Sequence, residues 1–235
     1  MKRAILNTFN SIGIQINRYP DSDLKRRLKL IKYFEINKIF DIGANVGNYA
    51  MVMRKLGFEG NIVSFEPLSD TFKKLQKNAS KDNNWETINI ALGDKDGESE
   101  INIAGNNDSS SILEMMPLHS KSAPESSYIG KERIKVNKLD TVFDNYYKKG
   151  DNVFVKIDTQ GYELNVLQGA EKSLSHIKGI QIEMSLVQLY DGGILYKEMI
   201  ELIEKKGFSL FSIENGFSDP ESGELLQMDG IFFKK

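Results

Sequence analysis

Acids and glycines lie where apolar strands of this chain give way to helices. In IFDIGANVGNYAMVMRKLG (residues 39–57), Asp41 closes an apolar run, and Gly43 and Gly47 precede a helical pattern. Glycine lets a ligand approach the backbone closely, and the N-terminus of the next helix offers free N–H groups. A carboxylate at the strand end attracts a cationic ligand and repels a phosphate-rich one. The stretch therefore predicts a binding site for a ligand that carries positive charge.

The dinucleotide-binding fingerprint is incomplete in this stretch. It requires glycine at positions 43, 45 and 48, but the chain has Asn45 and Asn48. The sequence therefore does not favour close contact between the backbone of this turn and a pyrophosphate. An NAD(P)-binding oxidoreductase is kept as the alternative hypothesis. S-adenosylmethionine fits better, because it carries an ammonium group, a sulfonium, a ribose and an adenine but no phosphate.

Later strand ends supply the other groups that such a cofactor needs. Asp41 could bind the ammonium group directly or through water, and Gly43 would leave room for the methionine chain. Glu66 ends VSFEP, where an acid can accept both ribose hydroxyls, as the analogous acid does for NAD. Ala91 and Leu92 end the next strand and could form an apolar shelf for adenine.

The elements that must position these residues alternate along the chain. Strands are expected at KIFDIG, NIVSFEP and WETINIAL, with helices at NYAMVMRKLG and SDTFKKLQKNAS between them. This rhythm predicts a parallel sheet with right-handed crossovers. The later part predicts strands at NVFVKID and IKGIQIEMS, helices at YELNVLQGAEKSL and YKEMIELIEKKG, and a closing pair at FSLFSI and LLQMDGIFFKK, the last at a sheet edge.

Composition narrows the class of protein. The chain has 235 residues, 40% of them hydrophobic, which suits one domain with small appendages. Its net charge of -2 gives no general attraction to nucleic acid or anionic membranes. The absence of cysteine excludes disulfides, thiolate zinc sites and cysteine nucleophiles, and fits a cytoplasmic protein. No apolar run is long enough to span a bilayer.

An ordered set of motifs resembles the FkbM family of S-adenosylmethionine-dependent methyltransferases over about residues 38–205. The motifs are FDIGANVGNYA, VSFEP, NIALGDKDGESEI, SSSIL, VKIDTQGYELNVLQGAEKSL and IQIEMS. The most telling element is Asp158, Gly161 and Glu163, although Gln160 stands where the family usually has an acid. The resemblance implies an α/β Rossmann-like class I methyltransferase fold. Its seven-stranded, mostly parallel sheet has an antiparallel last strand and helices on both faces.

The resemblance also implies O-methylation of a sugar or glycan hydroxyl, or of a related natural product. A non-catalytic cofactor-binding module is the other alternative. An alcohol is a poor nucleophile until its proton is removed, and the candidate catalytic residues are Asp158, Glu183 and His119. The predicted cofactor-binding residues are Asp41, Gly43, Ala44, Asn45, Gly47, Asn48, Glu66, Pro67, Ala91, Leu92, Ser110 and Asp158.

The acidic residues in the second half of the chain could also have purely structural roles. Asp158 could cap a helix that begins near Gly161, and Glu163 would be favoured in the first turn of that helix by the helix dipole. Asp158, Glu163 and Glu183 could together hold Mg²⁺, but we expect no metal.

Two segments flank or interrupt the predicted catalytic domain, residues 37–235. Residues 105–130 are polar and irregular, and we expect them to form a lid that shapes the acceptor site. Residues 1–36 form a predicted helical extension, in which Ile5, Phe9, Ile12 and Ile16 share one helix face. That face would dock against the body of the protein or a second copy, so a homodimer is possible, with interfacial membrane binding as the minor alternative.

Overall fold

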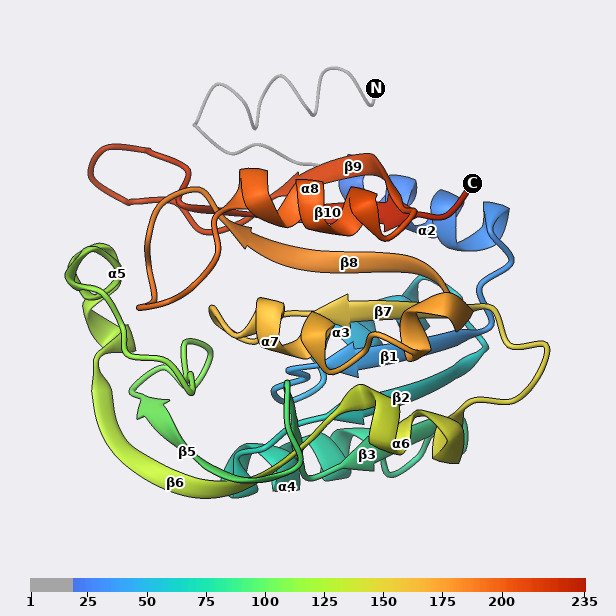
Figure 1. Cartoon of the computed structure of the whole chain (residues 1–235), viewed down its shortest axis with the longest axis horizontal. Coiled ribbons are helices and arrows are strands. Elements are labelled where there is room, and N and C mark those ends of the chain that lie inside the picture. Colours follow the sequence, from blue (N-terminus) through green and yellow to red (C-terminus); the bar gives the residue numbers. More distant parts are fainter. Residues whose placement is uncertain (1–18) are drawn as a thin grey trace, which may run out of the picture.

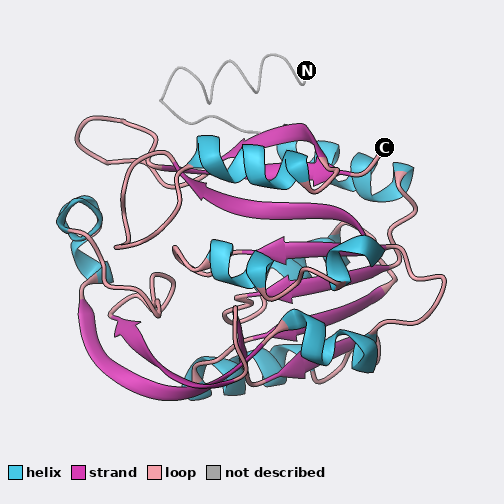
Figure 2. Ribbon diagram, in the orientation of Figure 1, coloured by secondary structure: helices cyan, strands magenta, loops and turns pink. Residues whose placement is uncertain are grey.

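Seven strands build the main sheet in the computed structural model, which describes residues 19–235 (Figures 1 and 2). The strand order is β3-β2-β1-β7-β8-β10-β9. The first five of these strands are parallel, and β10 runs antiparallel to both of its neighbours. The bounds are β1 Lys38–Ile42, β2 Asn61–Phe65, β3 Trp85–Ile88, β7 Val153–Ile157, β8 Ile177–Ser185, β9 Ser209–Asn215 and β10 Gln227–Phe233.

The predicted fold class is confirmed, but the expected edge position of the last strand is wrong. Strand β10 lies between β8 and β9, and β9 forms the edge. Ile231, Phe232 and Phe233 are completely buried. Such an apolar run needs a neighbouring strand on each side and a covered face above and below.

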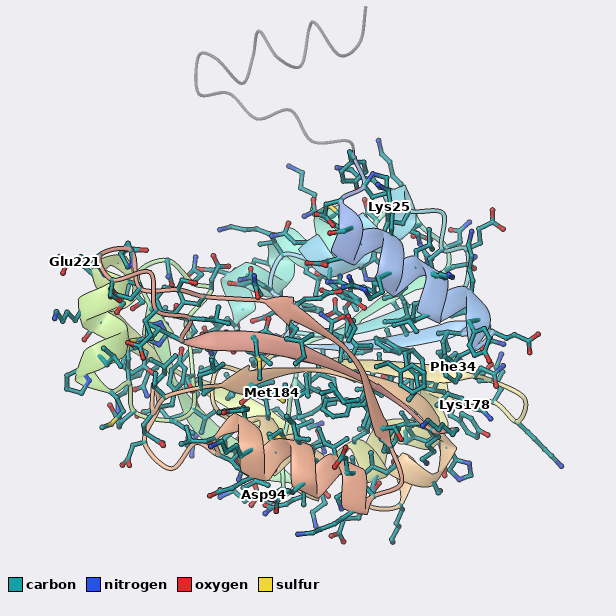
Figure 3. The ribbon with its side chains drawn as sticks, turned by 90° about the horizontal axis from the view of Figure 1, so that it is seen from above. Lys25, Phe34, Asp94, Lys178, Met184 and Glu221 are labelled. Carbon is teal, nitrogen blue, oxygen red and sulfur yellow. The ribbon has the colours of Figure 1, made fainter. Side chains whose placement is uncertain are left out.

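Helices cover both faces of the sheet. On one face lie α2 (Ser22–Tyr33), α3 (Asn48–Lys55) and α4 (Ser69–Ala79), which share a core with Ile39, Ile62 and Phe154. On the other face lie α6 (Leu139–Tyr146), α7 (Glu163–Gln168) and α8 (Tyr196–Lys205), around Phe40 and Ile42. Figure 3 shows α2, which carries Lys25, and α8 on opposite sides of the strands.

A second, three-stranded sheet extends beyond the main one. It contains β4 (Ala91–Leu92), β5 (Gly97–Ala104) and β6 (Tyr128–Asn137) in the order β4-β6-β5. The single strand expected over residues 85–92 is therefore wrong, since β3 joins the main sheet and β4 joins this one. The segment expected to be irregular, residues 105–130, contains α5 (Pro117–Ser122) and a 3₁₀ turn at Pro124–Ser126.

The long helix expected over residues 162–174 is also shorter than predicted. It ends after Gln168, and a separate 3₁₀ turn follows at Ser173–His176. A close backbone approach explains the break, because a Cβ atom on Gly169 would lie 1.9 Å from the carbonyl oxygen of Gly93. Only glycine permits this contact.

Helix α2 packs tightly against the sheet. Ile31 is buried, and the ring of Phe34, just after the helix, stacks on Phe233 at 4.0 Å between centroids. The predicted apolar face of Ile5, Phe9, Ile12 and Ile16 lies outside the described residues. Within residues 19–235, no helix has the length and apolar character needed to cross a bilayer.

Candidate active site

A cavity of about 440 Å³ opens at the carboxyl ends of β1, β2 and β7. Strand order reverses between β1 and β7, and ligands of open α/β sheets bind at such a switch point. Ten of the predicted residues line the cavity, namely Gly43, Ala44, Asn45, Asn48, Glu66, Pro67, Ala91, Leu92, Ser110 and Asp158. Asp41, Gly47, Glu183 and His119 are not among the lining residues.

The two glycines of the β1–α3 turn serve backbone packing. Gly43 and Gly47 have φ angles of 72° and 90°, in the left-handed region that favours glycine. A Cβ on Gly43 would lie 1.8 Å from the carbonyl oxygen of Asp158. A Cβ on Gly47 would meet the side chains of Trp85 and Leu75 at 2.6 and 2.8 Å. Gly43 thus brings the ends of β1 and β7 together. It also lines the cavity, and its room for a methionine chain stays a prediction.

Glu66 ends β2 with its carboxylate held by two backbone donors. Asn45 N–H donates to Glu66 Oε2 and Leu68 N–H donates to Oε1, both at 2.9 Å. The residue is 5% exposed, and burial raises the pKa of its carboxyl to about 7. Each oxygen keeps a free lone pair, so the group can accept hydrogen bonds from a ligand in the cavity.

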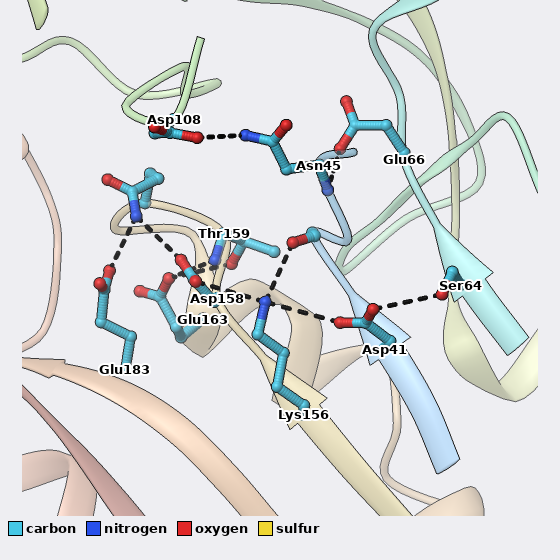
Figure 4. Close-up of polar contacts among 12 residues, drawn as sticks. Asp41, Asn45, Ser64, Glu66, Asp108, Lys156, Asp158, Thr159, Glu163 and Glu183 are labelled. Carbon is cyan, nitrogen blue, oxygen red and sulfur yellow. Dashed lines mark hydrogen bonds and ion pairs between the residues drawn. The ribbon is translucent and has the colours of Figure 1, made fainter. Parts of the chain in front are cut away.

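Asp41 does not reach the cavity, which corrects its predicted direct contact with a ligand. It is fully buried, where Ser64 Oγ donates to its Oδ2 at 3.2 Å and Lys156 Nζ lies 3.6 Å from its Oδ1 (Figure 4). Burial raises the pKa of Asp41, and the charge of Lys156 opposes that rise.

Lys156 connects Asp41 to the cavity. Its ammonium group donates to the carbonyl oxygen of Gly43 at 3.0 Å and lies 3.3 Å from Asp158 Oδ2. Burial acts to lower the pKa of Lys156, but Asp158 and Asp41 raise it above its ordinary value. The lysine therefore stays charged and holds the Asp158 carboxylate at the cavity wall.

Gln160 joins the two predicted catalytic acids, Asp158 and Glu183, both of which are labelled in Figure 4. Its Nε2 donates to Asp158 Oδ1 at 2.8 Å and to Glu183 Oε2 at 3.2 Å, while its Oε1 accepts from the hydroxyl of Tyr190 at 2.7 Å. Glu183 also accepts from Gln227 Nε2 at 2.7 Å. Burial, and then the charges of Asp158 and neighbouring acids, raise the pKa of Glu183 well above its ordinary value. Glu183 thus stands behind Gln160, one residue away from the cavity.

Glu163 organises the turn between β7 and α7. Its Oε1 accepts from the backbone N–H groups of Thr159 and Gly161 at 2.8 and 3.1 Å and from the Thr159 hydroxyl at 3.1 Å. It lies in the first turn of α7, as predicted, whereas α7 begins too late for Asp158 to cap it. Within residues 19–235, no group of three acidic or histidine side chains could together hold a metal ion.

His119 is buried away from the cavity, so its predicted role as a lid residue that reaches the acceptor is wrong. It lies in α5, and its ring contacts those of Tyr190 and Phe217, with centroids 5.1 and 5.4 Å apart. Burial lowers the pKa of His119. Helix α5 buries His119 together with Ser122, and this helix was not expected in a segment predicted to be irregular.

The predicted lid, residues 105–130, contacts both turns of the site. Asn45 Nδ2 donates to Asp108 Oδ1 at 2.6 Å, and Ser111 Oγ donates to the carbonyl oxygen of Gln160 at 2.6 Å. Ser110 lines the cavity, but its hydroxyl accepts from the N–H of Ala104. Asn107, Asp108, Ser110 and Ile112 of this segment line the cavity, and its role as a lid that shapes the acceptor site stays a prediction.

The cavity also contains polar residues that the sequence analysis did not identify. They include Arg27, Tyr49, Lys156, Gln181 and Asp229. Lys156 and Asp229 had a detectable signal, because each interrupts an apolar strand, NVFVKID and LLQMDGIFF. Nothing local distinguished Arg27 from the other basic residues of its helix.

Sequence comparisons place the chain in a family. The profile of the methyltransferase FkbM domain matches residues 41–210. The hexuronic acid methyltransferase AglP of Haloferax volcanii is 26% identical over 158 residues, which are 67% of this chain and 60% of that protein. The chain thus spans about three fifths of the length of this curated relative.

Solved structures share the fold. TehB of Haemophilus influenzae superimposes with a TM-score of 0.52 and 11% identity, over 93% of this chain and 64% of that one. TrmK of M. capricolum, solved in complex with S-adenosylhomocysteine, superimposes with a TM-score of 0.51 and 12% identity, over 93% of this chain and 70% of that one. At these identities the likeness concerns the fold alone.

Proposed function

The chain belongs to the FkbM methyltransferase family, and from that premise we propose that it transfers a methyl group from S-adenosylmethionine to a hydroxyl of a sugar. Hexuronic acids are the first acceptor class to test, because the relative AglP is named as a hexuronic acid methyltransferase. The observation that carries the proposal is a cavity-lining carboxylate, Asp158, held between Lys156 and Gln160 at the switch point of the sheet.

The donor fits the groups on the β2 side of the cavity. Glu66 offers two carboxylate oxygens for the ribose hydroxyls, and Ile90, Ala91 and Leu92 offer an apolar surface for adenine. The fold is that of TrmK, which was solved with the spent form of this donor. When bound, S-adenosylmethionine supplies a methyl group that is already activated by the sulfonium charge.

The chain must then align the acceptor and remove its proton. The side chain of Asp158 is 34% exposed, and its Oδ2 lies 3.3 Å from the ammonium group of the buried Lys156. We assign Asp158 as the general base, which accepts the hydroxyl proton while the acceptor oxygen bonds to the methyl carbon. The bond between that carbon and the donor sulfur breaks at the same time, so the electron pair stays on sulfur and S-adenosylhomocysteine is the leaving group. Gln160 orients Asp158, and Glu183 fixes Gln160 from behind. Glu183 is thereby a positioning residue.

Radiolabelled methyl transfer tests this proposal directly. Purified protein is incubated with methyl-labelled S-adenosylmethionine and a panel of free and oligomeric hexuronic acids and neutral sugars. Asp158→Asn should lower the rate of transfer about 10²-fold or more, since general-base catalysis typically contributes that much. Asp144→Asn, an exposed acid on α6, is the matched control and should keep the wild-type rate.

Each part of the proposal has its own contrary result. A wild-type rate in Asp158→Asn would remove Asp158 as the base. Binding of S-adenosylhomocysteine without transfer to any hydroxyl of the panel would reject the acceptor class. Binding of NADH, with no binding of S-adenosylhomocysteine, would reject the donor.

A further inference from the structure

Four polar side chains form a chamber on the α2–α3 side of the cavity. They are Arg27 of α2, Tyr49 of α3, Gln181 of β8 and Asp229 of β10, and all four line the cavity. This group, which we term the polar chamber, has no role in the chemistry assigned to Asp158. Its residues come from four separate elements, so only the folded protein brings them together.

Two polar atoms of the chamber are buried without a partner. In the described part of the chain, neither Tyr49 Oη nor Gln181 Oε1 makes a hydrogen bond. Gln181 is only 3% exposed. Leaving a buried polar atom unpaired costs roughly 1–3 kcal/mol, so such atoms in native proteins call for a ligand, an ion or water as the missing partner.

The chamber offers donors and acceptors side by side. Arg27 forms an ion pair with Glu214 and its guanidinium lies 5.2 Å from the centre of the Tyr49 ring. Burial and the charge of Asp158 raise the pKa of Asp229 to about 6, and the charges of Lys156 and Arg27, followed by contact with Gln181, oppose that rise. Arg27 and Tyr49 can donate to an anion, whereas Asp229 and Gln181 Oε1 can accept from a cation. A zwitterion with an ammonium and a carboxylate on one carbon matches this set.

The position of the chamber indicates which zwitterion it receives. The chamber and Glu66 line the same cavity, in which the Gly43 turn also takes part. Asp41, which the sequence suggested as the ammonium ligand, does not line the cavity. Its Oδ2 accepts from Ser64, and its Oδ1 lies 3.6 Å from Lys156 Nζ without a hydrogen bond. A donor whose ribose contacts Glu66 therefore has its amino-acid end free to extend toward α2 and α3.

We propose that the polar chamber binds the amino-acid end of the methyl donor. Gln181 Oε1 and Asp229 accept hydrogen bonds from its α-ammonium group, and Arg27 and Tyr49 donate to its α-carboxylate. This inference rests on the proposed function, because it takes S-adenosylmethionine as the donor. It also gives helix α2, which lies before the matched family domain, a part in donor binding.

Two nucleosides that differ only in the amino-acid end test the chamber. Calorimetry compares S-adenosylhomocysteine with 5′-methylthioadenosine, which keeps the nucleoside and the thioether but lacks the amino-acid group. Gln181→Leu should weaken S-adenosylhomocysteine about 10-fold or more, as expected for a hydrogen bond to a charged group, and leave 5′-methylthioadenosine within about 3-fold. Glu66→Gln should weaken both ligands by a similar factor.

Tyr49→Phe tests the chamber without destabilising the protein. It removes only a hydroxyl that has no partner, so the urea midpoint should not fall, while S-adenosylhomocysteine should bind several-fold more weakly. Ile180→Val, next to Gln181 but on the opposite face, should change neither affinity.

The contrary results separate this inference from the proposed function. If Gln181→Leu and Tyr49→Phe weaken both nucleosides equally, or neither, the chamber does not receive the amino-acid end although the donor class stands. Equal affinity of the wild type for the two nucleosides would overturn the inference in the same way. If the wild type binds neither nucleoside, both the inference and the proposed donor fail.

Discussion

The two faces of the main sheet differ sharply near the carboxyl ends of the strands. On the face under α6, α7 and α8, the strands present apolar side chains along their length, among them Phe40, Ile42 and Val155. On the face under α2, α3 and α4, the apolar residues Ile39, Ile62 and Phe154 give way to a polar row. Strand register aligns this row, which consists of Ser64, Asp41, Lys156 and Gln181.

This difference shows which face of the sheet stabilises the fold and which face carries the polar groups of the candidate site. Burying a polar row costs free energy unless its members are paired. Trp85 Nε1 donates to Ser64 Oγ, Ser64 donates to Asp41, and Lys156 connects Asp41 to Asp158. The pairing ends at Gln181, which faces the cavity with a free oxygen. One face thus provides the core, and the other leads from the core into the candidate site.

The largest effect is expected from Lys156→Met, which removes the one cation at the centre of the polar row. Asp41 would then keep a buried charge without its counterion, and breaking a buried pair costs about 3–5 kcal/mol of unfolding free energy. Urea denaturation measures this loss. Lys205→Met breaks an exposed pair on α8, with side chains 75% and 69% exposed, and should cost under about 0.5 kcal/mol. Equal losses of unfolding free energy in the two variants would show that the ion pair in the buried polar row contributes no more than the exposed pair on α8.

The pH dependence of stability should be dominated by acids near the cavity, such as Glu66. Its pKa is about 7 in the folded protein, above its ordinary value of 4.5. Between these values the folded state binds more protons than the unfolded state, so stability falls as pH rises from about 4.5 to 7. Glu66→Gln should reduce that fall by about 3 kcal/mol, measured by urea unfolding across the range.

The slope, rather than the absolute stability, is the informative quantity for Glu66→Gln, because the amide also changes two hydrogen bonds to backbone N–H groups. Glu201→Gln, an exposed change on α8, should leave the slope as in the wild type. An unaltered slope in Glu66→Gln would show that its carboxyl is ionised in the folded protein throughout this range.

Ser64→Ala should have an intermediate effect. It leaves the Trp85 indole N–H and an oxygen of Asp41 without their shared partner, and a buried unpaired group costs about 1–3 kcal/mol. Chemical denaturation followed by the fluorescence of Trp85, the single tryptophan of the sequence, reports both the stability and the local environment. No change in either signal would mean that the row is already hydrated.

The smallest effect is expected on the apolar face, from Ile180→Val. Ile180 is 1% exposed and belongs to the core under α8, and removal of one buried methylene costs about 0.5–1.5 kcal/mol. The melting temperature should fall slightly, while the affinity for S-adenosylhomocysteine should stay the same. A loss of affinity for S-adenosylhomocysteine would show that packing on the apolar face affects ligand binding on the polar face.

Strand-end chemistry made much of the site predictable. Glu66 and Asp158 are predicted because an acid that closes an apolar strand lies at the ligand-binding edge of a parallel sheet, and both line the cavity. The same reasoning placed Asp41 in the cavity, where it is not. Asp41 lies within β1, one residue before its end, and its side chain belongs to the polar row. There it lies beside Lys156 of the neighbouring strand β7. His119 failed for a different reason, since the helix that buries it was not foreseen.

The sequence by itself determined the alternation of strands and helices, the apolar faces and the acids and glycines at the turns, because period-two patterns and turn geometry depend on neighbouring residues. It also carried enough ordered motifs to indicate the family. Only the tertiary structure decided which polar groups meet: strand order places Lys156 between Asp41 and Asp158, and the docking of α2 brings Arg27 to the cavity. These contacts join residues far apart in the chain, so no local pattern encodes them.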